Sequence, residues 1–247
     1  MRKKRDYSII ILIGIIFVIG IVFGLFLQTS QKAAAPEQKI EKKEIEGVTK
    51  REIIIVGVDS NGKGVSAIMG VEVKPGTGLV LVNINNLLAD YQNQLSARTS
   101  AEIAGNITRT NLNTIDVIYS IKANASIIEG PSAGAAMTVA TIAALENKEI
   151  TPNVMITGTI EKSGAVDVVG GIKEKARAAK EVGARTLIIP AADYITNYQQ
   201  VKACKNIGNV KYCEVTYVAK KEELDRELGI KIVQIQNIEE AIELMIK

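Results

Sequence analysis

The sequence predicts an α/β (α+β) domain, because strand-type and helix-type segments alternate along most of its 247 residues. Short β-branched runs such as Arg51–Val58 favour strands, whereas small-residue runs such as Ser132–Asn147 favour helices. A domain of about two hundred residues is large enough to bury a core without disulfides or metals. Ahead of this domain, one long apolar run predicts a single N-terminal transmembrane helix.

Local signals define the individual elements. Gly183 follows Gly171–Val182 as a C-terminal cap, and Asn237 precedes Ile238–Ile246 as an N-cap. The expected strands are Arg51–Val58, Ala67–Val73, Gly78–Ile84, Thr114–Ile121, Val154–Ile160 and Thr186–Ile189. The expected helices are Leu88–Asn106, Ser132–Asn147, Gly171–Val182 and Ile238–Ile246.

The segment Gly57–Gly64 (GVDSNGKG) comes close to a phosphate-binding loop. Its last position, Gly64, stands where such a loop needs the Ser or Thr that holds magnesium. Val65–Val73 then has the pattern of a strand, whereas a phosphate-binding loop leads into a helix. We therefore expect a turn between strands here and no nucleotide site.

Residues 1–28 predict a cytoplasmic basic tip followed by a membrane anchor. Ser8–Leu27 carries no charge and is long enough to cross a hydrocarbon core of roughly 30 Å as a helix. Because Arg2–Arg5 is basic, the N-terminus is expected in the cytoplasm and the rest of the chain on the outer side of the cell membrane. Residues 29–50 predict a solvated linker, and residues 51–247 predict the globular domain.

Two alternatives bear on this location. A cleaved signal peptide could end near Ala33–Ala35, although Pro36 follows at once and the apolar run is longer than a signal peptide needs. Cys204 and Cys213 are the only cysteines and could form a disulfide, which persists in oxidising compartments. Two free thiols are the other interpretation of this pair.

Composition excludes several classes of function. Lys and Arg number 30 against 27 Asp and Glu, so nothing indicates a nucleic-acid partner. The absence of histidine excludes Ser-His-Asp triads, Cys-His pairs and H-E-x-x-H zinc sites, and two cysteines are too few for a four-cysteine zinc site. We therefore expect no cofactor and no metal. A hydrolase with a side-chain nucleophile would need Lys, Asp, Glu, Tyr or a terminal amine as its base.

Ser132 is the candidate nucleophile. It lies in Glu129–Gly134 (EGPSAG), at the predicted start of a helix, where Pro131 suits the first turn. N–H groups in a first turn lack intrahelical partners and can stabilise a forming oxyanion. The alternative is that Ser132 serves only as an N-cap.

Lys173 is the candidate base, within Gly170–Lys175 (GGIKEK). A lysine has a pKa of about 10.4 and becomes a base only when desolvation or nearby positive potential lowers that pKa. The first turn of a helix disfavours a cation by roughly 0.3–1 kcal/mol, so burial must do most of the work. A surface lysine is the alternative. Lys173 borders the expected apolar stripe of Ile172, Ala176 and Ala179, whereas the side chains expected in solvent are Lys175, Arg177 and Lys180.

Taken together, these segments resemble the proteolytic domain of the Lon protease family. Glu129–Gly134 and Gly170–Lys175 resemble its nucleophile and base motifs, and Met155–Gly158 resembles its M-T-G-E strand end. Asp116-Val117 stands at the matching interval before the serine. The resemblance covers roughly residues 51–247 and is to the membrane-anchored, ATPase-less Lon-like serine proteases of the archaeal type.

The resemblance implies a serine endopeptidase in which Ser132 is the nucleophile and Lys173 the general base. Thr157 would hold the lysine amine, and Glu129 would support the site. Because no ATPase module accompanies the motifs, the resemblance implies ATP-independent hydrolysis of unfolded or extended polypeptides through an acyl-enzyme. It also implies a homo-oligomer, by analogy a ring. Thr159 replaces the Glu usual in the family, so substrate preference is open.

Two other functions fit the same residues. The first is a catalytically degenerate Lon-like module that binds or assembles partner proteins. The second is a narrow processing protease that acts on one membrane-proximal client or on its own linker.

Overall fold

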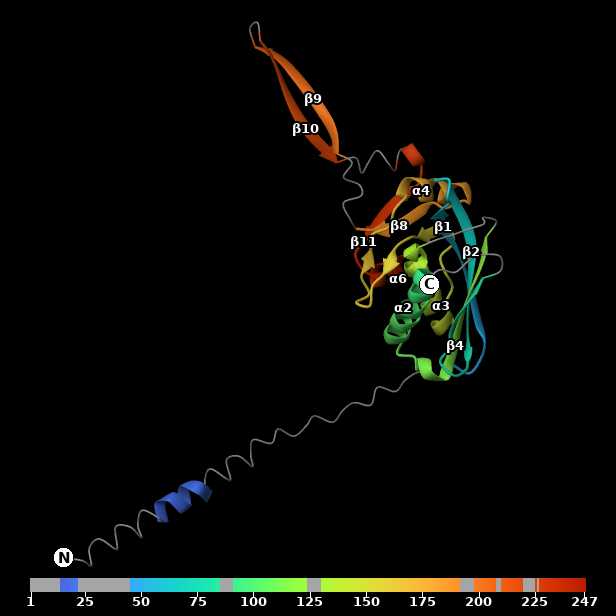
Figure 1. Cartoon of the computed structure of the whole chain (residues 1–247), viewed down its shortest axis with the longest axis vertical. Helices are drawn as coiled ribbons and strands as arrows, with labels where there is room; N and C mark the ends of the chain where they lie inside the picture. The colour runs from blue at the N-terminus through green and yellow to red at the C-terminus, as the bar shows by residue number, and fades with distance from the viewer. Residues whose placement is uncertain are drawn as a thin grey trace, which may run out of the picture. The chain divides into compact units, whose positions relative to one another are not determined.

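The computed structural model describes residues 14–21, 45–84, 91–123, 130–191, 198–207, 210–219, 225 and 227–247 (Figure 1). The chain divides into two compact units, Met1–Ile40 and Glu41–Lys247. In the first unit residues 14–21 are helical, and no helix among the described residues is long and apolar enough to cross a membrane. Residues 8–13 and 22–27 of the predicted span lie outside the described residues, so the transmembrane helix stays a prediction.

The larger sheet of the second unit has four strands. In spatial order these are β1 (Thr49–Val58), β2 (Gly64–Pro75), β4 (Ile115–Ala123) and β3 (Val80–Ile84). β1, β2 and β4 pair antiparallel, whereas β3 runs parallel to β4. Val58 faces Gly64 at the end of the first hairpin, so Gly57–Gly64 forms the expected turn between strands.

Asp116 of β4 organises the connection between β2 and β3. Its Oδ1 accepts the backbone N–H groups of Thr77 at 2.9 Å and of Leu79 at 3.0 Å. These hydrogen bonds lower the pKa of the Asp116 carboxyl because they favour its charged form. A Cβ atom on Gly76 would lie 2.2 Å from Asp116 Cγ, so the tight approach requires glycine.

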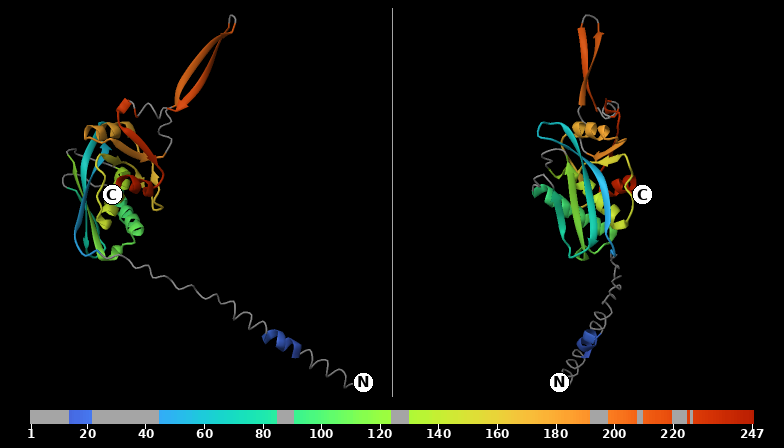
Figure 2. Two further views of the ribbon diagram at one scale, coloured as in Figure 1. Left: turned by 180° about the vertical axis from the view of Figure 1, so that it is seen from behind. Right: turned by 90° about the vertical axis from the view of Figure 1, so that its right-hand side faces the viewer.

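Two helices cover one face of this sheet (Figures 1 and 2). α2 (Tyr91–Thr108) packs beside α3 (Gly134–Glu146), and α3 also contacts β1 and β2. α3 is buried from Gly134 to Leu145, as expected for a helix of small and apolar residues on every side. The predicted helix Ser132–Asn147 is therefore largely confirmed, although its first turn is a separate 3-10 helix, η2 (Pro131–Ala133).

A parallel sheet of three strands forms the other half of the second unit. Its order is β11 (Lys231–Ile235), β8 (Thr186–Pro190) and β5 (Val154–Ile156). α4 (Ile172–Glu181) contacts β8, β1 and β2, and α6 (Ile238–Met245) contacts β5, β11 and α3. The predicted caps are confirmed, because Asn237 accepts the N–H of Glu240 and Gly183 has φ +88°.

The mixed α/β prediction is confirmed, but its strand Val154–Ile160 is interrupted. The chain leaves the parallel sheet after Ile156 and continues as β6 (Thr159–Ile160), which pairs with β7 (Val166–Asp167). Thr157 and Gly158 form the break between β5 and β6. This break lies beside η2 and becomes important for the site.

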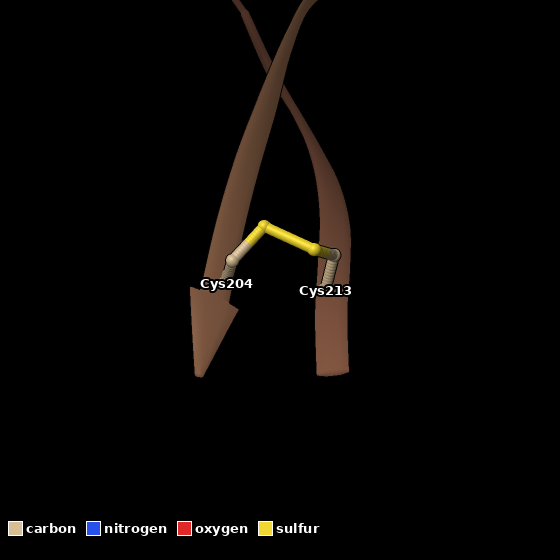
Figure 3. The surroundings of a disulfide bond; sticks show 2 residues. All are labelled: Cys204 and Cys213. Carbon is tan, nitrogen blue, oxygen red and sulfur yellow. A yellow bond between two sulfur atoms is a disulfide. The ribbon is translucent and has the colours of Figure 1, made fainter. Parts of the chain in front are cut away.

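An antiparallel hairpin follows β8 and was not predicted from the sequence. It consists of β9 (Tyr198–Ile207) and β10 (Val210–Ala219). Figure 3 shows the disulfide between Cys204 and Cys213, which face each other across the two strands. The sequence left a disulfide and two free thiols open, and the structure has the disulfide. Residues 202–205 are exposed, and a ribbon exposed in this way lacks the apolar alternation that marks a half-buried strand.

Candidate active site

Ser132 is the middle residue of η2, the 3-10 turn that leads into α3. The N-cap residue of η2 is Gly130 and that of α3 is Ala133, so the interpretation of Ser132 as an N-cap is wrong. Gly130 has φ +92°, a conformation that favours glycine, at the entry to the turn. The Ser132 side chain, which makes no cap, is half-buried.

The break after β5 holds the turn from one side. Gly158 N–H donates to the carbonyl of Ser132 at 2.9 Å, and the Gly158 carbonyl accepts the N–H of Ala135 at 3.0 Å. The Thr157 hydroxyl also donates to the Ser132 carbonyl, at 3.3 Å. A Cβ on Gly158 would lie 2.3 Å from Val166 Cγ1, so a larger residue would push this support away from the turn.

Lys175 is the lysine that the fold buries next to this support. It is only 4% exposed, and its Nζ donates to the Thr157 hydroxyl at 3.3 Å. Burial lowers the pKa of the Lys175 amine to about 8, because desolvation disfavours the charged form. The Thr157 hydroxyl therefore contacts both the Lys175 amine and the main chain of Ser132.

Lys173 lies in a different environment. Its side chain is 43% exposed, and its Nζ forms an ion pair with Glu227 at 2.5 Å. Arg177 reaches the same carboxylate at 3.5 Å. The prediction that Lys173 would be desolvated is wrong, and so is the prediction that Lys175 would be in solvent. The predicted contact of Thr157 with a lysine amine is present, but the lysine is Lys175.

The sequence contained a signal for Lys175. Ile172, Ala176 and Ala179 form a stripe with helical spacing, and position 175 is three residues after the first of them. The buried face of α4 includes all four residues, together with Ala178. Lys175 was expected in solvent because its side chain is charged. Its position on the helix nevertheless places it on the buried face.

Two further expectations concern groups around the site. Glu129 lies outside the described residues, so its supporting role stays a prediction. Within the part of the chain that the structure describes, no cluster of three His, Cys, Asp or Glu side chains is arranged to hold a metal.

Comparison with known proteins gives a consistent family. The model of the Lon protease (S16) C-terminal proteolytic domain matches residues 85–220. The Lon protease of Phenylobacterium zucineum (strain HLK1) is 38% identical over 100 residues, which are 40% of this chain and 13% of that protein. The Lon protease of Metamycoplasma arthritidis (strain 158L3-1) is 30% identical over 132 residues, 51% of this chain and 16% of that protein.

A third relative has a shorter but more similar match. The Lon protease of Clostridium acetobutylicum is 47% identical over 62 residues, 25% of this chain and 8% of that protein. The matched regions thus span less than a fifth of the relatives' own length.

Proposed function

Because the chain belongs to the Lon protease (S16) C-terminal proteolytic domain family, we propose that it is a serine endopeptidase with a Ser132–Lys175 dyad. One observation carries the dyad: the buried Lys175 amine is joined through the Thr157 hydroxyl to the turn that holds Ser132. A lysine whose pKa is lowered to about 8 is partly neutral near neutral pH, as a general base must be. This assignment replaces Lys173 as the base.

The reaction follows from these two groups. The neutral Lys175 amine takes the proton of Ser132 as Oγ attacks the carbonyl carbon of the scissile peptide bond. The resulting ammonium gives that proton to the leaving nitrogen, the C–N bond breaks, and an acyl-enzyme ester remains. Water then gives a proton to the amine and attacks the ester carbon; the bond to Oγ breaks, and the ammonium returns the proton to Oγ, which releases the acid product and restores Ser132 and the neutral amine. Backbone N–H groups at the start of the helix stabilise the oxyanion formed in each step.

Replacing Ser132 by Ala is expected to abolish cleavage of unfolded casein by the full-length protein in detergent without ATP. The reason is that no acyl-enzyme can form without Oγ. Fluorescent casein fragments measured over time provide the test. Ser163→Ala is the matched control, since this serine lies in the exposed turn between β6 and β7 and should keep full activity. Turnover that survives in Ser132→Ala contradicts the proposed nucleophile.

We further propose that residues 8–27 anchor the protein and that the protease domain lies outside the cytoplasm. The basic run Arg2–Arg5 supports this orientation, and the Cys204–Cys213 disulfide supports an oxidising compartment. ATP is scarce there, so the enzyme would act without it on polypeptides that are already unfolded or extended.

The disulfide offers a test of this location. Protein taken from membranes under thiol-trapping conditions is expected to react with maleimide-polyethylene glycol only after reduction, and then at both cysteines. Reaction of both cysteines without a reductant contradicts the oxidising location.

A further inference from the structure

α2 carries two buried serines whose hydroxyls bond outside their own helix. Thr108 of the same helix donates to the carbonyl four residues earlier, the usual acceptor for a helical hydroxyl. Ser96 instead donates to the carbonyl of Pro131 at 3.3 Å, and Ser100 donates to that of Gly134 at 2.9 Å. Ser96 is 5% exposed and Ser100 is fully buried; the Ser100 bond is buried and the Ser96 bond is partly buried. α2 therefore contacts the nucleophile turn directly through the Ser96 hydroxyl.

 The turn thus has two supports: α2 through the Ser96 hydroxyl, and the break after β5 through the Gly158 backbone and the Thr157 hydroxyl.

The bond from Ser96 controls the direction of one backbone N–H group. The carbonyl of Pro131 shares a peptide plane with the N–H of Ser132, and in a trans peptide the two groups point in opposite directions. The Pro131 carbonyl also accepts the N–H of Gly134, so both of its lone pairs are used and the plane has little freedom to rotate. A donor on the carbonyl also polarises the peptide and makes its N–H a stronger donor.

We propose that Ser96 is a positioning residue that orients the N–H of Ser132 toward the oxyanion, an inference that rests on the proposed function. This N–H lies in the first turn of η2, where no intrahelical acceptor exists. N–H groups fixed in advance toward a developing oxyanion lower the barrier, because no reorientation is needed during the reaction. Gly158 holds the carbonyl of Ser132 in the same way and so aligns the next N–H, that of Ala133.

Ser100 provides a matched control on the same helix. The carbonyl that it contacts, that of Gly134, shares its plane with the N–H of Ala135, which already donates to Gly158 at 3.0 Å. That N–H is therefore not available to an oxyanion. The Gly134 carbonyl also keeps the Thr138 hydroxyl as a donor at 2.9 Å. Ser100→Ala removes a buried hydroxyl without releasing the Ser132 peptide.

Full-length variants in detergent are assayed for cleavage of a fluorogenic extended peptide and for binding of a peptide boronic acid. Boron forms a tetrahedral adduct on the serine, so the affinity of the boronic acid reports on the oxyanion site. Ser96→Ala is expected to lower kcat about tenfold with KM unchanged, and to lower the affinity for the boronic acid by a similar factor. The reason is that the Ser132 N–H remains as a donor but loses its fixed direction. Ser96→Cys keeps the size of the side chain, but a thiol is a weak donor. Its kcat should therefore fall between those of the wild type and Ser96→Ala. Ser100→Ala should stay within about twofold of the wild type in both measurements, since it leaves the Ser132 peptide held.

Three outcomes would count against these ideas in different ways. Wild-type kcat and boronic-acid affinity in Ser96→Ala overturn the positioning role. Equal losses of kcat and boronic-acid affinity in Ser96→Ala and Ser100→Ala also overturn the positioning role, because a change in the packing of α2 would then explain both losses. A wild-type protein that neither cleaves the peptide nor binds the boronic acid rejects the proposed function itself.

Discussion

Replacing Lys175 by Met is expected to lower kcat/KM for peptide hydrolysis by about 10³-fold, the contribution typical of a general base. Lys173→Met is the matched control from the same helix turn and should stay within about twofold of the wild type. Its ion pair with Glu227 is exposed, and exposed pairs contribute little. Initial rates with a fluorogenic peptide measure both effects. The reverse result, an inactive Lys173→Met and an active Lys175→Met, would restore the assignment made from the sequence.

The pH dependence of the wild type follows from the same lysine. Burial lowers the pKa of Lys175 to about 8, and only the neutral amine can accept the proton of Ser132. The value of kcat/KM should therefore rise with pH and level off above about 8. A rise that continues to about 10.4, the ordinary lysine pKa, would show that the base is a solvated lysine.

A folding control separates catalysis from stability in Lys175→Met. Below pH 8 the buried ammonium costs the wild type about 3 kcal/mol, because a lysine pKa lowered from 10.5 to about 8 disfavours the charged form by about 1.4 kcal/mol per pH unit. The folded state binds fewer protons than the unfolded state between pH 8 and 10.5, so this cost fades across that window. The inactive variant should therefore be more stable than the wild type at neutral pH in urea unfolding, and the gain should shrink toward pH 10.5.

Gly64→Ala is expected to lower both thermal stability and peptide hydrolysis. Gly64 is the first residue of β2. A Cβ there would lie 2.0 Å from the Glu174 carbonyl oxygen and 2.7 Å from its carbon, so the backbone of α4 must move. Overpacking of this kind costs about 1–3 kcal/mol, and about 2–4 °C of Tm per kcal/mol in a domain of this size. Lys175 follows Glu174 directly, and a displacement of about 1 Å can reduce kcat about 10²-fold.

Gly70→Ala is the matched control for this prediction, because Gly70 lies in the same strand. A Cβ at Gly70 would meet only the Ser120 carbonyl oxygen, at 3.9 Å, an ordinary contact. Thermal unfolding and peptide hydrolysis should therefore separate the two variants. Equal Tm and equal kcat for Gly64→Ala and Gly70→Ala would mean that the close approach of α4 to β2 has no consequence for the site.

The sequence predicted most helices and strands because their burial is regular. The strands of the larger sheet and the helices α3, α4 and α6 were found from apolar periodicity and from caps such as Asn237 and Gly183. β11 and the hairpin of β9 and β10 were missed. β11 is short, and its partner β8 is distant in the chain. The hairpin lacks a regular apolar pattern, and residues 202–205 of β9 are exposed.

The sequence by itself excluded a histidine base and supplied the two short motifs that predict a serine nucleophile and a lysine base. Only the tertiary structure decided which of the two lysines is buried and desolvated. Lys173 and Lys175 are two residues apart, and the first turns toward Glu227 while the second turns toward Thr157. The physical reason is that successive helical residues point about 100° apart, so a shift of two positions separates solvent from the interior. Desolvation depends on what packs against each direction, and β1, β2 and β8 supply that packing around α4.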